Sequence, residues 1–328
     1  MQPATQKNGF FIGVLFATLV PLLTLPFLAA LKFPFDQSLA LGLFILAGGV
    51  GHVASTACVY ADKAVRDVMK PMKLRFYALP LGVIAITLAA VFWGSSLKVS
   101  ESLVVFLFTV HLFWLHFHYQ KQNYGLVAFV AASESTRVPR MLSWLLLIPA
   151  LAGVLAIMPP LMSAAFGEAN FYQPYQATFY STAVVIYLIG VLVIGILVAK
   201  NFSSFAKPRT AVMATASTLF FLPAVLVGQS EYAFWSYATA HGFQYLLMVY
   251  LMTGGPKLSL RPLAAFFVAL VCGGFLLHRL TKEGIQILFL CGIMLNWVHF
   301  ILDAKIWRMS EPGPRKLLRG RFAFLFSK

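Results

Sequence analysis

The stretch SLVVFLFTVHLFWLHFHYQKQNYGLVAFVA, residues 102–131, decides the fold class of this chain. Its two ends are almost entirely apolar, but its centre, residues 111–125, holds three histidines, a lysine, two glutamines and an asparagine. An apolar run of this length can cross a lipid bilayer, which needs about 20 helical residues. Ionisable groups inside such a run are costly and usually functional. The stretch therefore predicts a membrane-spanning helix that carries part of a site.

The composition of the whole chain places it among membrane proteins. Of its 328 residues, 60% are hydrophobic and only 11% are charged, whereas soluble domains carry about 25% charged residues. The apolar runs predict an all-α integral membrane protein, a polytopic helical bundle of about ten transmembrane helices, with a range of eight to ten. The predicted spans are residues 10–31, 38–60, 74–95, 102–131, 141–165, 175–199, 210–228, 232–252, 262–278 and 285–304.

The positive charge of the chain sets the orientation of these spans. The net charge is +15, but the lysines and arginines fall in the gaps between apolar runs, which indicates membrane topology and not nucleic-acid binding. With ten spans, 20 of these residues lie on one side of the membrane and four on the other. Because cytoplasmic segments collect lysine and arginine, both termini are expected in the cytoplasm.

The gaps between spans are short, so we expect a single transmembrane domain over residues 1–304 and a basic cytoplasmic tail over residues 305–328. The tail contains PGPRKLLRGRFAFLFSK, residues 312–328, in which basic residues precede phenylalanines. This pattern suits a segment that lies on an anionic membrane surface. A disordered tail is the alternative.

Six of the seven histidines fall on spans that run in one direction, from outside to cytoplasm. These spans are residues 38–60, 102–131, 232–252 and 285–304, and only His278 lies elsewhere. At about 1.5 Å per helical residue, the histidines lie between the middle of the bilayer and its cytoplasmic third. Neighbouring helices could therefore bring several of them together at one depth.

Helical phase separates the three histidines of the 102–131 span. His111 and His118 are seven residues apart, which places them within about 20° of each other on the helix surface. Gln122 extends that face, whereas His116 points away from it and shares its own face with Gln120. We therefore expect the interior role for His118.

A metal site is the interpretation that these residues favour. Neutral imidazole binds iron, zinc or copper well, and a ring of histidines keeps the net charge of a buried site low. Glutamate is absent from the spans, which disfavours a carboxylate-bridged di-iron site. Each histidine alone could instead hydrogen-bond between helices. The predicted metal ligands are His52, His118, His241, His299 and His111, and the groups predicted to orient them in catalysis are Gln122, Gln244 and Asp303.

Four segments resemble signatures of bacterial polytopic membrane proteins: GHVASTACVYAD (51–62), HYQKQNYG (118–125), HGFQYL (241–246) and HFILDAKIW (299–307). The scattered histidines, with histidine followed four residues later by aspartate, are also similar to the bacterial Brp/Blh carotene dioxygenases, proposed to use His-ligated iron. This resemblance implies a bacterial inner-membrane protein with His52, His118, His241 and His299 as iron ligands. The H-x-x-K-Q-x-x-G element at residues 118–125 departs from that family's pattern, so its substrate is not carried over.

Three functions are consistent with this pattern. The first is an iron-dependent oxidoreductase, an oxygenase or desaturase, whose partners are the lipid bilayer and a lipophilic substrate that enters from it. The H-x-x-H-H clusters of membrane desaturases are missing. The alternatives are a transporter with a polar path lined by histidine and glutamine, and a haem-binding electron-transfer protein with histidine axial ligands. We rank them enzyme, transporter and haem protein.

Overall fold

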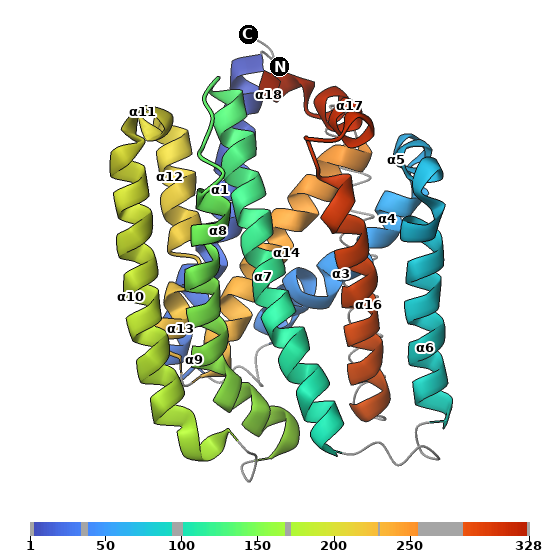
Figure 1. Ribbon diagram of the computed structural model, residues 1–328, viewed down its shortest axis with the longest axis vertical. Coiled ribbons are helices and arrows are strands. Elements are labelled where there is room, and N and C mark those ends of the chain that lie inside the picture. The colour runs from blue at the N-terminus through green and yellow to red at the C-terminus, as the bar shows by residue number, and fades with distance from the viewer. Residues whose placement is uncertain are drawn as a thin grey trace. The chain divides into compact units, whose positions relative to one another are not determined.

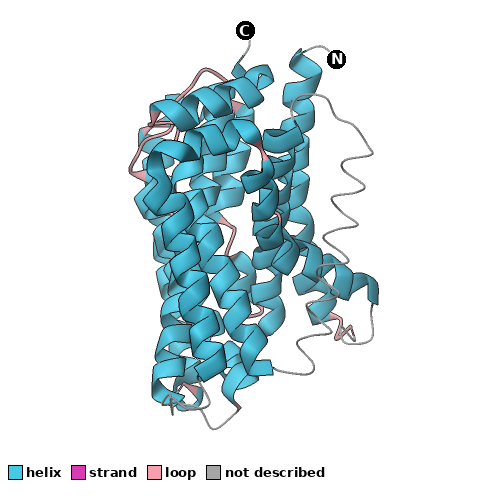
Figure 2. Cartoon of the chain, turned by 90° about the vertical axis from the view of Figure 1, so that its right-hand side faces the viewer, coloured by secondary structure: helices cyan, strands magenta, loops and turns pink. Residues whose placement is uncertain are grey.

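The computed structural model describes residues 3–33, 39–93, 101–167, 172–228, 230–254 and 285–326. All regular structure within these ranges is helical (Figure 2). The prediction of an all-α chain is therefore confirmed. The predicted span 262–278 and His278 lie outside the described residues.

The chain divides into two compact units, which are described separately. Unit 1 comprises residues 1–35 and 106–241, and unit 2 comprises residues 36–105 and 242–326. Two of the boundaries, 105/106 and 241/242, fall inside long helices, α7 (Glu101–Ser133) and α14 (Glu231–Gly254). The expected single domain over residues 1–304 stays a prediction.

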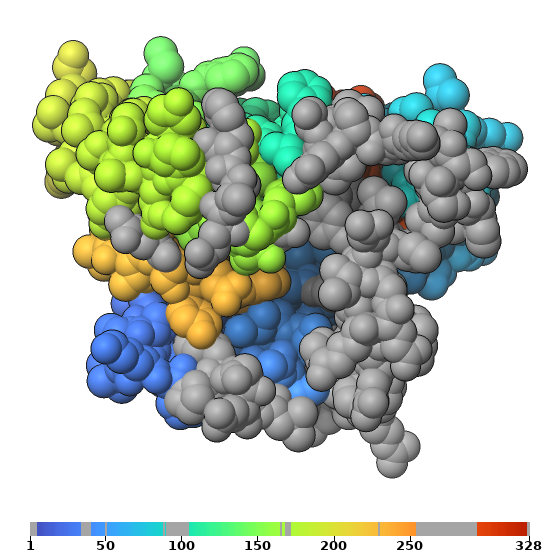
Figure 3. Space-filling model, turned by 90° about the horizontal axis from the view of Figure 1, so that it is seen from below, coloured from blue at the N-terminus to red at the C-terminus, as the bar shows by residue number. Residues whose placement is uncertain are grey.

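Unit 1 is built around two long helices that pack along each other, α9 (Leu147–Phe166) and α10 (Gln176–Lys200) (Figure 1). Their atoms form one green-to-yellow block in the space-filling view (Figure 3). A β-carbon at Gly190 of α10 would lie 3.0 Å from Cδ of Pro149, so a glycine there lets the two helices approach closely. The other elements of the unit are α1 (Pro3–Ala30), α8 (Leu142–Leu145), η5 (Gln173–Tyr175), α11 (Phe202–Phe205), α12 (Pro208–Thr218) and α13 (Leu222–Leu226).

Unit 2 is built around α6 (Leu79–Trp93) and α16 (Ile285–Ile306), which pack together. Helix α16 also contacts α3 (His52–Ala54), and this contact positions the candidate site. The other elements are α2 (Leu39–Leu46), η2 (Ala47–Gly51), α4 (Thr56–Ala61), α5 (Lys63–Met69), η3 (Lys70–Met72), η4 (Leu74–Ala78), α17 (Pro312–Arg321) and α18 (Ala323–Phe326).

Four helical segments of the described chain are long and apolar enough to cross a membrane: Thr5–Ala30, Leu41–Ala61, Leu142–Ala164 and Gln173–Lys200. On α10, Leu188 and Leu192 are each more than 60% exposed, although leucine is normally buried in water-soluble proteins. A bilayer would cover such a surface with hydrocarbon. The fold therefore fits a multi-pass membrane protein.

The predicted span 210–228 differs from the structure, where it is two short helices. Helix α12 ends at Thr218 and α13 begins at Leu222. Pro223 lacks the N–H that would bond to the carbonyl of Leu219, and its ring clashes with that carbonyl in a continuous helix. The break therefore has a local cause.

Candidate functional site

The backbone before His52 fixes the tautomer of its imidazole ring. The π-helical turn η2, with the sequence AGGVG, runs directly into His52. Nδ1 of the buried His52 ring lies 2.6 Å from the carbonyl oxygen of Gly48. Because a carbonyl can only accept, Nδ1 carries the proton and the lone pair of the neutral ring lies on Nε2. Single π-helical turns inside α-helices are frequent at functional sites.

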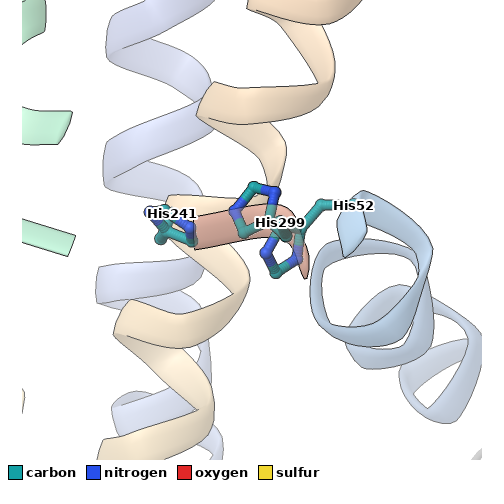
Figure 4. A group of neighbouring side chains, drawn as sticks. All are labelled: His52, His241 and His299. Atoms are coloured by element: carbon teal, nitrogen blue, oxygen red, sulfur yellow. The ribbon is translucent and has the colours of Figure 1, made fainter. Parts of the chain in front are cut away.

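His299 faces His52 within unit 2. The two ring centroids are 5.2 Å apart, and a ring nitrogen of each lies within 4.8 Å of the other. Nδ1 of His299 shares a hydrogen bond of 3.2 Å with the Thr56 hydroxyl, and Nε2 lies 3.5 Å from Oδ2 of Asp303. Figure 4 shows the pair on α3 and α16 and also labels His241, which belongs to unit 1.

Aromatic side chains surround this pair. The ring of Tyr245 is 4.5 Å from that of His299 and 5.9 Å from that of His52. The indole N–H of Trp307 donates to Oδ1 of Asp303 at 3.1 Å. Thus one carboxylate oxygen is held by Trp307 while the other faces His299, which gives Asp303 the position of a group that orients the imidazole.

Helix α14 reaches the π-helical turn at Gly242. A β-carbon at this position would overlap the carbonyl oxygen of Gly48, the same oxygen that accepts from His52. Only glycine allows the two backbones to approach so closely. The orientation of His52 and the packing of α14 therefore depend on the same carbonyl group.

Unit 1 holds a second pair of histidines, His118 on α7 and His241 on α14. Their ring centroids are 5.0 Å apart, and the ring of Tyr119 lies 4.2 Å from that of His241. The amide nitrogen of Gln122 donates to the backbone carbonyl of His241 at 3.1 Å. This hydrogen bond links α7 to α14 at His241.

His116 lies on another face of α7, as its helical phase predicts, and is bonded to protein at both nitrogens. Nδ1 bonds to the carbonyl of Leu112 at 2.8 Å, and Nε2 bonds to the Tyr237 hydroxyl at 2.9 Å. Its ring stacks on Phe221 at 5.2 Å. His116 is more deeply buried than the half-buried His118, and its contacts are those of a structural side chain.

The remaining predicted site residues, His111 and Gln244, are also buried. His111 lies on α7 in unit 1, and Gln244 lies on α14 in unit 2. Sequence reasoning did not select Tyr119, Tyr237 or Trp307 as neighbours of the site. Trp307 had a usable signal, since it follows Asp303 by one helical turn.

These contacts define a helical protein, suited to a membrane, with buried histidine clusters that could hold a metal ion. The clusters offer imidazole nitrogens and one carboxylate, a donor set that transition metals accept. Comparison with protein-family models, curated proteins and solved structures finds no match for the chain.

Proposed function

We propose that this protein is an integral-membrane, metal-dependent oxidoreductase of the oxygenase or desaturase type, with iron as the metal and a lipid or isoprenoid as the substrate. The observation that carries the proposal is the buried pair of His52 and His299, in which His52 donates from Nδ1 to Gly48. Histidine ligands of metals commonly donate their other ring N–H to a carbonyl or carboxylate. The arrangement of His52 is that of a ligand prepared for a metal.

His118 and His241 complete the proposed ligand set, with His111 as a further candidate. Their combination with His52 and His299 rests on the sequence, in which all of these histidines fall on predicted spans of one direction. Neutral imidazoles add no charge to a site in a low-dielectric bilayer. In this proposal the ligands are oriented by Gln122, Gln244 and Asp303.

An apolar cavity in unit 1 is large enough for part of a lipophilic substrate, and none of the proposed metal ligands is among its lining residues. It has a volume of about 490 Å³ and lies between α1, α12 and α13, with Leu19, Ala216 and Pro223 among its lining residues. Ligand pockets of about 300–1,000 Å³ are typical of small-molecule sites. A hydrocarbon chain would find no charged group among the residues that line this cavity.

The proposed oxidation reaction determines which metal the site would need. Zinc has no redox chemistry, whereas a bound iron ion would be able to activate dioxygen taken up from the surroundings, with two electrons from an external reductant for each hydrocarbon oxidised. The histidines of this chain would hold the metal, and the rings of Tyr119 and Tyr245, which lie 4.2 and 4.5 Å from those of His241 and His299, would limit the access of water to it.

The proposed topology is a bundle of eight to ten spans with both termini in the bacterial cytoplasm. The length of α7 is sufficient for one of these spans, since 33 helical residues extend for about 50 Å and the hydrocarbon core is about 30 Å thick. The unequal distribution of lysine and arginine between the two sides supports the orientation.

The test is metal analysis of the full chain purified in detergent, together with its absorption spectrum. Wild-type protein is expected to contain iron in a fixed ratio to the chain and no Soret band, and His118→Gln or His241→Gln should lose the iron. His116→Gln is the matched control, because it changes a buried histidine of α7 whose nitrogens bond to protein. Active protein without any transition metal would contradict the proposal, and a Soret band would favour the haem alternative.

A further inference from the structure

Helix α17, close to the C-terminus, is fixed to unit 2 and does not need a membrane to cover its apolar side. It packs against α5 (Figure 1), and its residues Pro314 and Leu318 are buried. Arg321, in its last turn, forms an ion pair of 2.8 Å with Asp62, the residue that precedes α5. Helices α5 and α17 therefore form one rigid surface within the unit.

This surface carries a large excess of positive charge. Residues 62–75 and 305–321 together contain eleven lysines and arginines and three acidic residues. Each acid already has a basic partner within unit 2: Asp62 pairs with Arg321, Asp67 with Lys70, and Glu311 with Lys305. The rest of the positive charge is not neutralised by carboxylates of these two segments. We call the exposed basic side chains the basic platform: Lys63, Lys70, Lys73, Arg308, Arg315, Lys316 and Arg319.

The basic platform adjoins an exposed apolar surface. Leu74 directly follows Lys73 and is 73% exposed, and Ile86 on α6 is 72% exposed. In a bilayer, the exposed leucines and isoleucines of a helix contact hydrocarbon, while lysines at the end of the helix extend to the interface. The change from basic to apolar side chains therefore falls at residues 73–75, which in a bilayer would lie at the depth of the lipid headgroups.

We propose that the basic platform binds the phosphate groups of anionic phospholipids in the cytoplasmic leaflet. The positive charge of the platform is complementary to the phosphate groups, and its side chains adjoin the exposed apolar surface. Arginine and lysine near a membrane surface attract anionic lipid, and arginine can contact a phosphate with two parallel hydrogen bonds. A nucleic acid would be attracted by the same charge, but it would leave the adjoining apolar surface exposed to water.

The experiment uses the full chain in nonionic detergent with equal amounts of phosphatidylglycerol and phosphatidylcholine, and native mass spectrometry counts the lipids retained. Wild-type protein is expected to retain phosphatidylglycerol preferentially. The triple variant Arg315→Gln, Lys316→Gln and Arg319→Gln should lose that preference by about five-fold for each charge removed. The matched control removes three exposed charges from unit 1, by Arg137→Gln, Lys200→Gln and Lys207→Gln.

Retention of the preference in the control and its loss in the platform variant support the proposal. Equal losses in both variants, or no preference in wild-type protein, overturn it, and so does an oligonucleotide that displaces the phosphatidylglycerol. Circular dichroism verifies that the variants fold. The iron content of the same preparations should not change, which separates this test from that of the proposed oxidoreductase.

Discussion

Nδ1 of His52 lies 2.6 Å from the carbonyl oxygen of Gly48, and that oxygen also leaves no space for a β-carbon at position 242. The relationship joins the chemistry of one imidazole to the packing of α14. It explains why a glycine follows His241.

Gly242→Ala is expected to destabilise the protein and to disturb His52. The new methyl group would overlap the Gly48 carbonyl, so the backbone must shift, at a cost of about 1–3 kcal/mol or more. Thermal unfolding of the detergent-solubilised chain should show a lower Tm, and bound iron should decrease. Gly125→Ala is the control, because a β-carbon there meets nothing within 4 Å and should raise helix stability by up to about 1 kcal/mol.

His116→Phe is expected to reduce stability without affecting the metal. It leaves the Tyr237 hydroxyl without its hydrogen bond to His116 in a buried position, which costs about 1–3 kcal/mol. Adding Tyr237→Phe should recover part of the loss, since both polar partners are then replaced by apolar groups. Unfolding free energies of the four proteins in this cycle measure the coupling. Iron loss in His116→Phe would assign this histidine to the metal site and contradict the structural role.

Asp303→Asn is expected to weaken metal binding while keeping the bond from Trp307. The amide oxygen still accepts from the indole N–H, but an amide NH2 group, which cannot accept a hydrogen bond, takes the place of the carboxyl oxygen 3.5 Å from His299. Removing such a partner of a ligand typically costs about 10–100-fold in metal affinity, which competition with a chelator measures. Trp307→Phe is the comparison, and a larger effect from it than from Asp303→Asn would show that packing matters more than the carboxylate.

The Asp62 side chain has two contacts that substitutions can separate. It accepts from the backbone N–H of Val65 at the start of α5 and pairs with Arg321. Asn is as good an N-cap as Asp, so Asp62→Asn should remove only the ion pair and cost less than about 1 kcal/mol. Asp62→Ala loses both and should cost about 1–2 kcal/mol. Limited proteolysis after Arg319 should accelerate in both variants, and unchanged rates would contradict the anchoring of α17.

The sequence predicts the helical class well because apolar runs and polar insertions depend only on local composition. Helical phase also separates His118 from His116, since both lie on one continuous helix. Pro223 signals the break between α12 and α13. The apolar run over residues 210–228 is nevertheless long enough to be interpreted as one span. The bond between His116 and Tyr237, 121 residues apart, and the approach of Gly242 to Gly48 depend on tertiary packing, which no local pattern specifies.

X-ray absorption at the iron edge of the purified chain tests the central claim most directly, because it reports the ligands of a bound metal. The account predicts an iron ion with several imidazole nitrogens, weaker imidazole scattering in His52→Gln, loss of the iron signal in His241→Gln, and an unchanged spectrum in His116→Gln. A spectrum without imidazole ligands, or active protein without iron, would contradict it.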